Sequence, residues 1–312
     1  MNALAIAVLL AAGTAEPAPP PPAVGEAVDS VADRSLRMTV PVNIGERGPF
    51  DFVVDTGAER TVLSEELANT LGLGRTGSAE VHSISGAQRF ATVTVPSLSV
   101  TSTQVRNVQA PLLKRGNLGA EGLLGIDSLQ SKAILIDFAQ QKIVVTPARD
   151  APALKAGDDD TIVIRARSRL GRLILADAAI GQRRIAVVID TGAEHSVGNF
   201  AMRNIAVKRG KAALLIPTTL HDVAGGSVPA EIAVVNDMRL GSVTLTGMPI
   251  AFADLPVFRQ LGLDKRPAML LGMNTLRAFD QVAVDFATKT VRFVVPGDSS
   301  REDAARLASA SP

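Results

Sequence analysis

Two copies of one stretch decide the fold of this chain: FDFVVDTGAER at residues 50–60 and IAVVIDTGAEH at residues 185–195. In each copy, apolar residues typical of a buried strand lead into Asp-Thr-Gly-Ala-Glu, which is identical in both. The two aspartates, Asp55 and Asp190, are 135 positions apart. A carboxylate at the end of an apolar strand is costly to bury unless hydrogen-bond donors surround it and it has a task. The stretch therefore predicts two related halves, each contributing one carboxylate to a shared site.

Further landmarks extend the duplication over most of the chain. They recur in the same order: VHSISGA (81–87) with LHDVAGG (220–226), EGLLGID (121–127) with AMLLGMN (268–274), and ILIDFAQQKIVV (134–145) with VAVDFATKTVRF (282–293). The offset between the copies only grows along the chain, as small insertions in loops would produce. Landmarks in a fixed order at a slowly growing offset indicate an internal repeat.

Within the first copy, short runs rich in β-branched residues are bounded by Gly, Pro, Asn and Ser, and this pattern predicts strands and hairpins. One stretch, LSEELANTLGL (63–73), predicts a helix instead. Its Ser64 can cap the helix, and Glu65 and Glu66 complement the positive end of the helix dipole. We therefore expect each half to be mostly β.

Changes in composition divide the chain into segments. Residues 3–12 form an apolar run of signal-peptide length, an acidic and Pro-containing stretch near residue 155 has the composition of a linker, and the C-terminal end is small and polar. We expect a signal peptide at 1–15, a Pro-rich spacer at 16–34, an N-terminal lobe at 35–150, a linker at 151–160, a C-terminal lobe at 161–297 and a flexible tail at 298–312. A signal peptide implies export to the periplasm or cell envelope, and an uncleaved N-terminal anchor is the alternative.

Composition excludes several kinds of chemistry. The 312 residues include 32 Lys and Arg against 31 Asp and Glu, so there is no basic excess for a nucleic-acid partner. The absence of cysteine excludes a thiolate nucleophile, Cys-ligated zinc and iron–sulfur clusters. With only three histidines and no Trp or Tyr, the chemistry is expected to rest on carboxylates.

The two Asp-Thr-Gly-Ala motifs can form one catalytic unit. If a pseudo-twofold axis relates the halves, Asp55 and Asp190 meet on it, and two carboxylates in contact share one proton. Such a pair can activate a water for attack on a peptide carbonyl without a covalent intermediate. The glycines of the motifs allow close backbone approach, and the hydroxyls of Thr56 and Thr191 can bond to the opposite half.

These residues resemble the retropepsin-like aspartic proteases of the pepsin superfamily, in the bacterial, exported, single-chain form with two lobes. The resemblance covers roughly residues 36–147 and 161–296. It implies two pseudo-twofold-related β-barrel lobes with a central cleft, and a catalytic pair formed by Asp55 and Asp190. It also implies active-site support by Thr56, Gly57, Ala58, Thr191, Gly192 and Ala193, substrate-binding flaps with tips at Ser85, Gly86, Gly225 and Gly226, and supporting strands at Leu123-Leu124-Gly125 and Leu270-Leu271-Gly272.

The chain also departs from the family pattern. Single-chain pepsins carry a Tyr on one flap, and this chain has none, so His82 or Ser83 or the flap backbone alone would act there. The dimeric retroviral enzymes carry Arg after the apolar-apolar-Gly, where this chain has Ile126 and Met273. The ion pair that stabilises those dimers is therefore expected to be missing.

Other motifs have plainer interpretations. Gly72 to Gly77 fits the dinucleotide pattern GxGxxG, but it follows a predicted helix and indicates a helix end and turn. His82 and His221 are better explained as packing or solvated residues than as metal ligands, because no ligand spacing accompanies them. Ser196 beside His195 lacks the Gly-x-Ser-x-Gly context of a serine hydrolase. The run 158–160 is interpreted as a solvated linker, and Asp137 and Asp285 as structural residues at hairpin turns.

The sequence thus predicts a monomeric aspartic endopeptidase that needs no metal or organic cofactor and binds an extended peptide or protein substrate by β-strand pairing. No stable membrane insertion and no nucleic-acid partner are expected. The alternative is a catalytically inactive, peptide-binding envelope protein on the same fold. A further possibility keeps the chemistry but pairs like lobes from two chains in a dimer.

Overall fold

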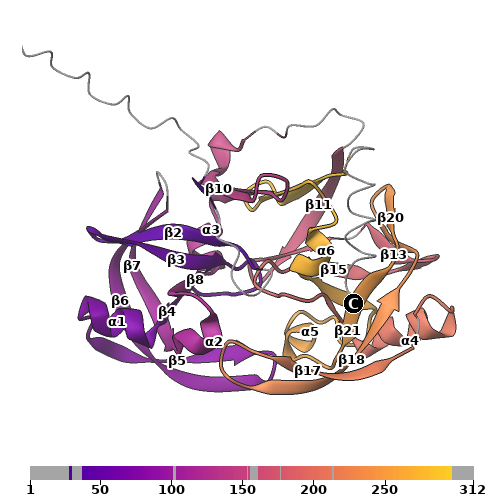
Figure 1. Ribbon diagram of the computed structural model, residues 1–312, viewed down its shortest axis with the longest axis horizontal. Helices are drawn as coiled ribbons and strands as arrows, with labels where there is room; N and C mark the ends of the chain where they lie inside the picture. The colour runs from indigo at the N-terminus through magenta and orange to yellow at the C-terminus, as the bar shows by residue number, and fades with distance from the viewer. Residues whose placement is uncertain are drawn as a thin grey trace, which may run out of the picture.

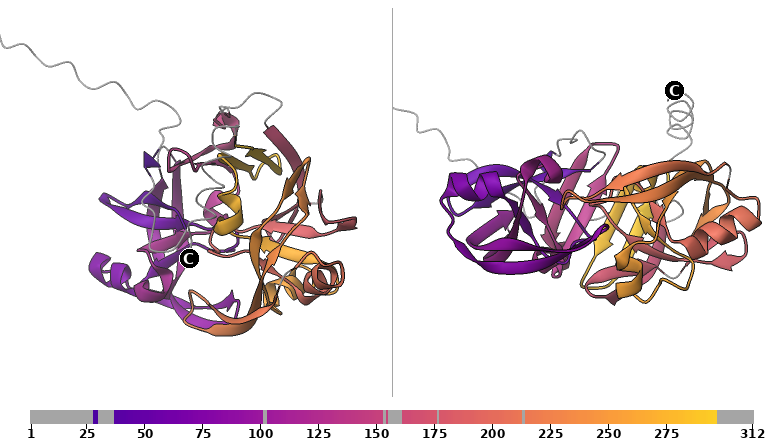
Figure 2. Two further views of the ribbon diagram at one scale, coloured as in Figure 1. Left: turned by 45° about the vertical axis from the view of Figure 1, so that its right-hand side comes forward. Right: turned by 90° about the horizontal axis from the view of Figure 1, so that it is seen from below.

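The computed structural model describes residues 28–29, 37–100, 103–152, 154, 161–175, 177–212 and 214–296. The expected signal peptide, the C-terminal tail and most of the expected linker lie outside these residues. The described chain is mostly β and forms two lobes that lie side by side (Figures 1 and 2). None of the described helices is long and apolar enough to cross a membrane.

The N-terminal lobe is a seven-stranded sheet in the order β2-β3-β8-β4-β7-β6-β5, and β2 also pairs with β6, which curls the sheet toward closure. Its helix α1 (Glu65–Leu71) begins as predicted, with the Ser64 hydroxyl accepting from the Leu67 N–H at 3.0 Å. The strands and remaining helices are β2 (Thr39–Ile44), β3 (Arg47–Val54), β4 (Val62–Ser64), β5 (Arg75–Ser83), β6 (Gly86–Val100), β7 (Thr103–Leu113), α2 (Arg115–Leu118), β8 (Gly122–Leu124) and α3 (Ile126–Leu129).

The C-terminal lobe repeats this plan with a second parallel strand pair, β15 with β22, that corresponds to β3 with β8. A separate four-stranded sheet, β14-β13-β19-β20, completes it. Its elements are β11 (Thr161–Arg169), β12 (Arg172–Leu175), β13 (Ala178–Ile180), β14 (Arg183–Arg184), β15 (Ala186–Ile189), β16 (Val197–Gly198), α4 (Phe200–Lys208), β17 (Ile216–His221), β18 (Ser227–Val235), β19 (Met238–Leu240), β20 (Val243–Leu245), β21 (Met248–Phe252), α5 (Pro256–Gln260), β22 (Ala268–Leu271) and α6 (Met273–Leu276).

The lobes are joined by a shared sheet. Strands β9 (Lys132–Asp137) and β10 (Lys142–Pro147) follow the N-terminal lobe, and β23 (Gln281–Asp285) and β24 (Thr290–Val294) follow the C-terminal lobe. These four strands lie in the order β10-β9-β23-β24, with β9 and β23 antiparallel. Leu135 pairs with Ala283, its own counterpart in the repeat, so the pseudo-twofold axis passes between these two residues.

The segment predicted as a Pro-rich spacer is not wholly separate from the fold. Its residues Val28–Asp29 form β1, which pairs with β10 at the edge of the shared sheet. The open edge of β10 offers unpaired backbone groups, and an extended segment can satisfy them whatever its side chains. A short 3₁₀ turn, Ala148–Asp150, follows β10 at the exit from the N-terminal lobe.

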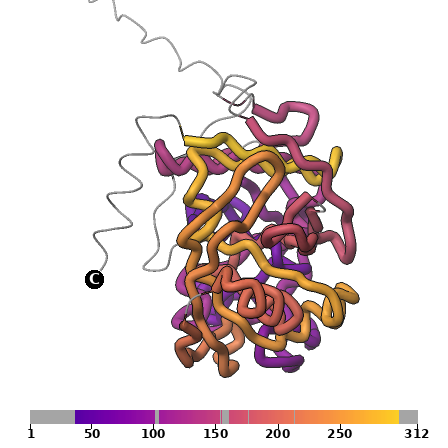
Figure 3. The backbone as a smooth tube through the Cα atoms, turned by 90° about the vertical axis from the view of Figure 1, so that its right-hand side faces the viewer, coloured from indigo at the N-terminus to yellow at the C-terminus, as the bar shows by residue number. Residues whose placement is uncertain are grey.

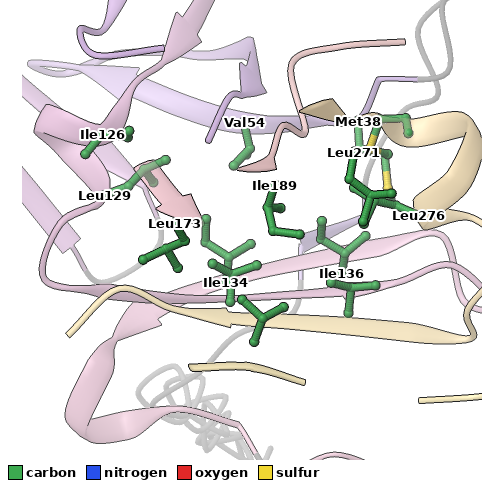
Figure 4. Packing of buried hydrophobic residues seen from close by; sticks show 14 of the residues in the cluster. Met38, Val54, Ile126, Leu129, Ile134, Ile136, Leu173, Ile189, Leu271 and Leu276 are labelled. Atoms are coloured by element: carbon green, nitrogen blue, oxygen red, sulfur yellow. The ribbon is translucent and has the colours of Figure 1, made fainter. Parts of the chain in front are cut away.

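One hydrophobic core runs through both lobes and the shared sheet. Figure 4 shows Val54 and Ile189, the residues directly before the two aspartates, among the apolar side chains above Ile134 and Ile136 of β9. All four side chains are at most 1% exposed. The shared sheet therefore supports the bases of both aspartate loops. Seen from the side, it lies at one end of the molecule, and hairpins from both lobes lie at the other (Figure 3).

Candidate active site

Both aspartates are placed by the same local arrangement. Strand β3 runs parallel to β8, and the Asp55 N–H donates to the Leu124 carbonyl at 3.0 Å. Strand β15 runs parallel to β22, and the Asp190 N–H donates to the Leu271 carbonyl at 3.1 Å. These bonds fix the point where each chain leaves its strand, so both Asp-Thr-Gly-Ala loops start at the boundary between the lobes.

Each carboxylate lies against the glycine of the opposite loop. A Cβ built on Gly57 would lie 2.5 Å from Asp190 Oδ1, and a Cβ on Gly192 would overlap the Asp55 carboxylate. Only a residue without a side chain leaves this space. The structure therefore brings Asp55 and Asp190 together across the boundary, as the sequence predicted.

Backbone donors of its own loop hold each carboxylate. Asp55 Oδ1 accepts from the N–H groups of Gly57 at 2.8 Å and Ala58 at 2.9 Å. Asp190 Oδ1 accepts at 3.1 Å from the N–H groups of both Gly192 and Ala193. One oxygen of each carboxylate is thus oriented by the loop, and the other remains available for the partner aspartate or a bound water.

The two threonines tie the loops to each other. Thr56 Oγ1 donates to the Ile189 carbonyl at 2.9 Å and accepts from the Thr191 N–H at 3.1 Å. In the symmetric arrangement, Thr191 Oγ1 donates to the Val54 carbonyl at 2.6 Å and accepts from the Thr56 N–H at 3.1 Å. Both side chains are 2% exposed. The hydrogen bonds expected between the hydroxyls and the opposite lobe are therefore present in both directions.

Burial of the two carboxylates and their closeness to each other raise their pKa values. Burial raises the pKa of Asp55, although its backbone hydrogen bonds and the positive charges of Arg172 and Arg37 work to lower it. Burial, followed by the negative charge of Asp55, raises the pKa of Asp190 to about 7. The two groups titrate as one system, so below about pH 7 the pair retains one shared proton.

Arg172 of the C-terminal lobe joins the lobes beside this pair. Its Nε donates to the Gly57 carbonyl at 2.7 Å and its Nη1 contacts Glu59 Oε1 at 3.0 Å. The side chain is 7% exposed, and its charge lowers the pKa of both aspartates. Ile126 and Met273 follow the two apolar-apolar-Gly strands, and the ion pair between the lobes is made instead by Arg172 and Glu59. The sequence could have pointed to Arg172, because it follows Arg37 by 135 positions, the same offset that separates the two aspartates.

A cleft of about 500 Å³ opens over the aspartates, between the lobes and two hairpins. The hairpin of β5 and β6 has Ser85 and Gly86 at its tip, and that of β17 and β18 has Gly225 and Gly226. The tips meet, since the Ser85 N–H donates to Asp222 Oδ2 at 3.1 Å. Figure 1 shows the two hairpins side by side opposite the shared sheet. The residues predicted as flap tips thus lie at the tips of the two hairpins, and their neighbours Ile84 and Val223 line the cleft.

The other polar residues considered from the sequence lie in different settings. His82, His195 and His221 all line the cleft, and His82 contacts Glu80 at 3.1 Å. In the described part of the chain, no group of three His, Asp or Glu side chains is arranged to hold a metal ion. Ser196 is fully buried and hydrogen-bonds to Asn274, so its role is structural.

Asp137 and Asp285 occupy hairpin turns of the shared sheet. Asp137 Oδ1 accepts from the Gln140 N–H and Asp285 Oδ1 accepts from the Thr288 N–H, both at 2.9 Å. These bonds close the two turns in the same way. The structural interpretation of both residues is confirmed.

Comparison with known protein families matches each lobe separately. Residues 40–131 match the family described as "gag-polyprotein putative aspartyl protease". Residues 176–275 match the family described as "Aspartyl protease". Each match contains one Asp-Thr-Gly-Ala loop and the apolar-apolar-Gly strand that supports it. No curated protein matches the chain.

Proposed function

Because this chain belongs to the retropepsin-like aspartyl proteases, with one family domain in each lobe, we propose that it is an endopeptidase whose catalytic pair is Asp55 and Asp190. One observation carries the proposal. The two carboxylates meet over each other's glycines at the floor of a cleft, and burial raises the pKa of both.

The chemistry follows from the shared proton. The ionised carboxylate accepts a proton from a water as the water oxygen attacks the carbonyl carbon of the peptide bond. The protonated carboxyl group donates a hydrogen bond to the carbonyl oxygen, which stabilises the negative charge that develops on this oxygen in the tetrahedral intermediate. When the C–N bond breaks, a proton passes to the leaving nitrogen, so acid and amine products form and the pair recovers its single proton.

The hairpins supply a means of binding the substrate. Strands β5 and β17 carry backbone donors and acceptors along the roof of the cleft, and an extended peptide can pair with such groups whatever its sequence. Apolar side chains line the cleft on both sides of the aspartates, with Leu113 and Leu123 on one side and Leu255 and Leu270 on the other. Hydrogen bonds to the peptide backbone would therefore provide affinity, and these apolar residues would determine which substrate side chains fit.

The test is cleavage of a diverse peptide pool from about pH 4 to 8, where the pair changes protonation. Asp55→Asn and Asp190→Asn should each abolish cleavage, and a statine-type inhibitor should block the wild-type protein. Asp51→Asn is the matched control, because Asp51 is an exposed aspartate of β3 four positions before the catalytic loop. Cleavage that survives either dyad substitution would reject the proposal. Peptide retention without turnover at any pH would favour the inactive, peptide-binding alternative.

Export and a monomeric state belong to the same proposal. A covalently linked pair of lobes already contains both aspartates, so one chain suffices for the site. Mass measurement in solution should give a monomer, and a dimer would favour pairing of lobes between chains. Sequencing the N-terminus of protein recovered from the envelope fraction should show a start after residue 15, and an intact N-terminus would favour an anchor.

A further inference from the structure

The duplication allows the charges of the two halves of the cleft to be compared position by position. Three pairs of titratable residues that line the cleft are related by the same offset of 135 as the aspartates: Arg37 and Arg172, Glu59 and Glu194, and Arg60 and His195. If the halves were electrically equivalent, the pseudo-twofold axis would relate equal charges. The structure departs from that symmetry at all three pairs.

On the N-terminal side, the carboxylate is neutralised and a cation remains. Glu59 pairs with Arg172, which reaches over from the other lobe. The next residue, Arg60, is exposed, and within the described residues its guanidinium has no ion pair or hydrogen bond. This side of the cleft therefore presents one unpaired positive charge to a ligand.

On the C-terminal side, an anion remains. Arg37, the counterpart of Arg172, donates to the Leu118 carbonyl at 2.6 Å and does not pair with Glu194. In the part of the chain that the structure describes, the Glu194 carboxylate has no ion pair or hydrogen bond. Its neighbour is His195, at the position where the N-terminal copy carries Arg60. This side therefore presents one unpaired negative charge.

Two further carboxylates line the cleft outside the aspartate pair, and each contacts another side chain of the hairpins. Glu80 contacts His82 at 3.1 Å, and Asp222 accepts from Ser85 of the opposite hairpin. Arg60 and Glu194 directly follow the two catalytic loops, so the pseudo-twofold axis places them on opposite sides of the aspartate pair. The cleft thus has a positive side and a negative side.

We propose that this polarity selects substrates with an acidic side chain on one side of the cleaved bond and a basic side chain on the other, bound in one chain direction only. The inference rests on the proposed function and names its substrate class. A site with twofold-symmetric backbone would accept an extended peptide in either direction. Arg60 and Glu194 remove that equivalence, since the reversed peptide would meet two like charges.

The test uses a pool of peptides in which an apolar pair is flanked at the second and third positions by Glu, Lys or Gln in every combination, assayed near pH 7. One order of Glu and Lys should be cut at least about fivefold faster, by kcat/KM, than the reversed order of the same composition. The double variant Arg60→Glu with Glu194→Arg should invert the preferred order. Arg167→Glu makes the same charge change as Arg60→Glu alone, on exposed β11 outside the cleft, and should leave the order unchanged.

Retention of the same peptides on the Asp55→Asn protein separates this inference from the proposed function. A preferred order in retention supports the polarity even if no peptide is cut, in which case the proposed function fails alone. If peptides with the two orders of Glu and Lys are cleaved equally fast, the proposed charge preference is wrong, whereas the proposal of an endopeptidase is supported. Equal retention of both orders, or no inversion by a folded double variant, also overturns the polarity.

Discussion

The Ser85 hydroxyl at the tip of the N-terminal hairpin donates a 2.5 Å hydrogen bond to the Asp222 carboxylate at the tip of the C-terminal hairpin. Apolar contacts accompany it in both directions. Ile84 packs against the buried cluster of the C-terminal lobe, and Val223 packs against a buried cluster of the N-terminal lobe. Each hairpin therefore packs against the opposite lobe as well as against the other hairpin.

Removing the hydroxyl should loosen this closure. In Ser85→Ala the Asp222 carboxylate loses the hydroxyl donor of Ser85, so amide hydrogen exchange at residues 83–86 and 222–226 should be faster. Mass spectrometry of exchanged peptides measures the change. Thr70→Val is the control, because the Thr70 hydroxyl bonds within α1. Unchanged exchange at the tips would show that the apolar contacts alone hold the hairpins.

The same closure should depend on acid. Burial works to raise the pKa of Asp222, but hydrogen bonds from the side chains of Ser85 and Ser83 and from the Gly226 N–H outweigh it and lower that pKa. A lowered pKa in the closed state means that the bond stabilises closure fully above the usual aspartate range, near pH 4, and is lost as pH falls through the lowered pKa. Hydrogen exchange at the tips, corrected for its intrinsic pH dependence, should therefore rise only at the acid end. The acid-dependent rise should be absent in Asp222→Asn.

Gly192 should tolerate no side chain. The Cβ of Gly192→Ala would overlap the Asp55 carboxylate, so this variant should lose peptide cleavage and about 1–3 kcal/mol of unfolding free energy. Gly74→Ala is the matched control, since a Cβ there meets open space and the backbone is ordinary. Its stability should stay within about 0.5 kcal/mol of wild type. An active Gly192→Ala protein would contradict the placement of Asp55.

Neutralising one aspartate should stabilise the fold in a pH-dependent way. Because the pKa of Asp190 is raised to about 7, the folded chain keeps a proton that the unfolded chain releases above about pH 4. Wild-type stability therefore falls as pH rises between these values. Asp190→Asn should exceed wild type by roughly 1–3 kcal/mol near pH 7 and by much less near pH 4, measured by urea unfolding. The same pH dependence in both proteins would contradict this.

Arg172 should set the pH range of activity. Its positive charge lowers the pKa of both aspartates, so Arg172→Gln should shift the pH profile of kcat/KM to higher pH. The variant also leaves the Gly57 carbonyl without its donor, at a cost of about 1–3 kcal/mol in stability. Arg239→Gln, which breaks an ion pair with Asp177 outside the cleft, is the control. Lower activity with an unshifted profile would indicate a purely structural role.

Much of this architecture could be predicted from the sequence because the signals are local or repeated. The cap of Ser64 depends on residues three apart in the chain, and the aspartate loops appear twice with identical letters. Helix α4 was not predicted. Only Met202 and Ala206 of this helix are buried, while Phe200 and Val207 are exposed, so its apolar residues show no clear helical stripe.

Contacts between the lobes could not be predicted from such local signals. The repeat relates Arg172 to Arg37, but the two make different hydrogen bonds, one to Gly57 and one to Leu118. Which arginine pairs with a carboxylate depends on how the lobes meet. The bond from Ser85 to Asp222 likewise joins two loops that sequence alone does not bring together.

The shared sheet has a consequence for the lobes as folding units. Strand β9 has β10 of its own lobe on one edge and β23 of the other lobe on the opposite edge, and a single hydrophobic core continues across them. Separating the two lobes would expose a strand edge and the buried side chains of Ile134 and Val282. A chain cut between the lobes, in residues 151–160, should therefore remain one particle and melt in a single transition.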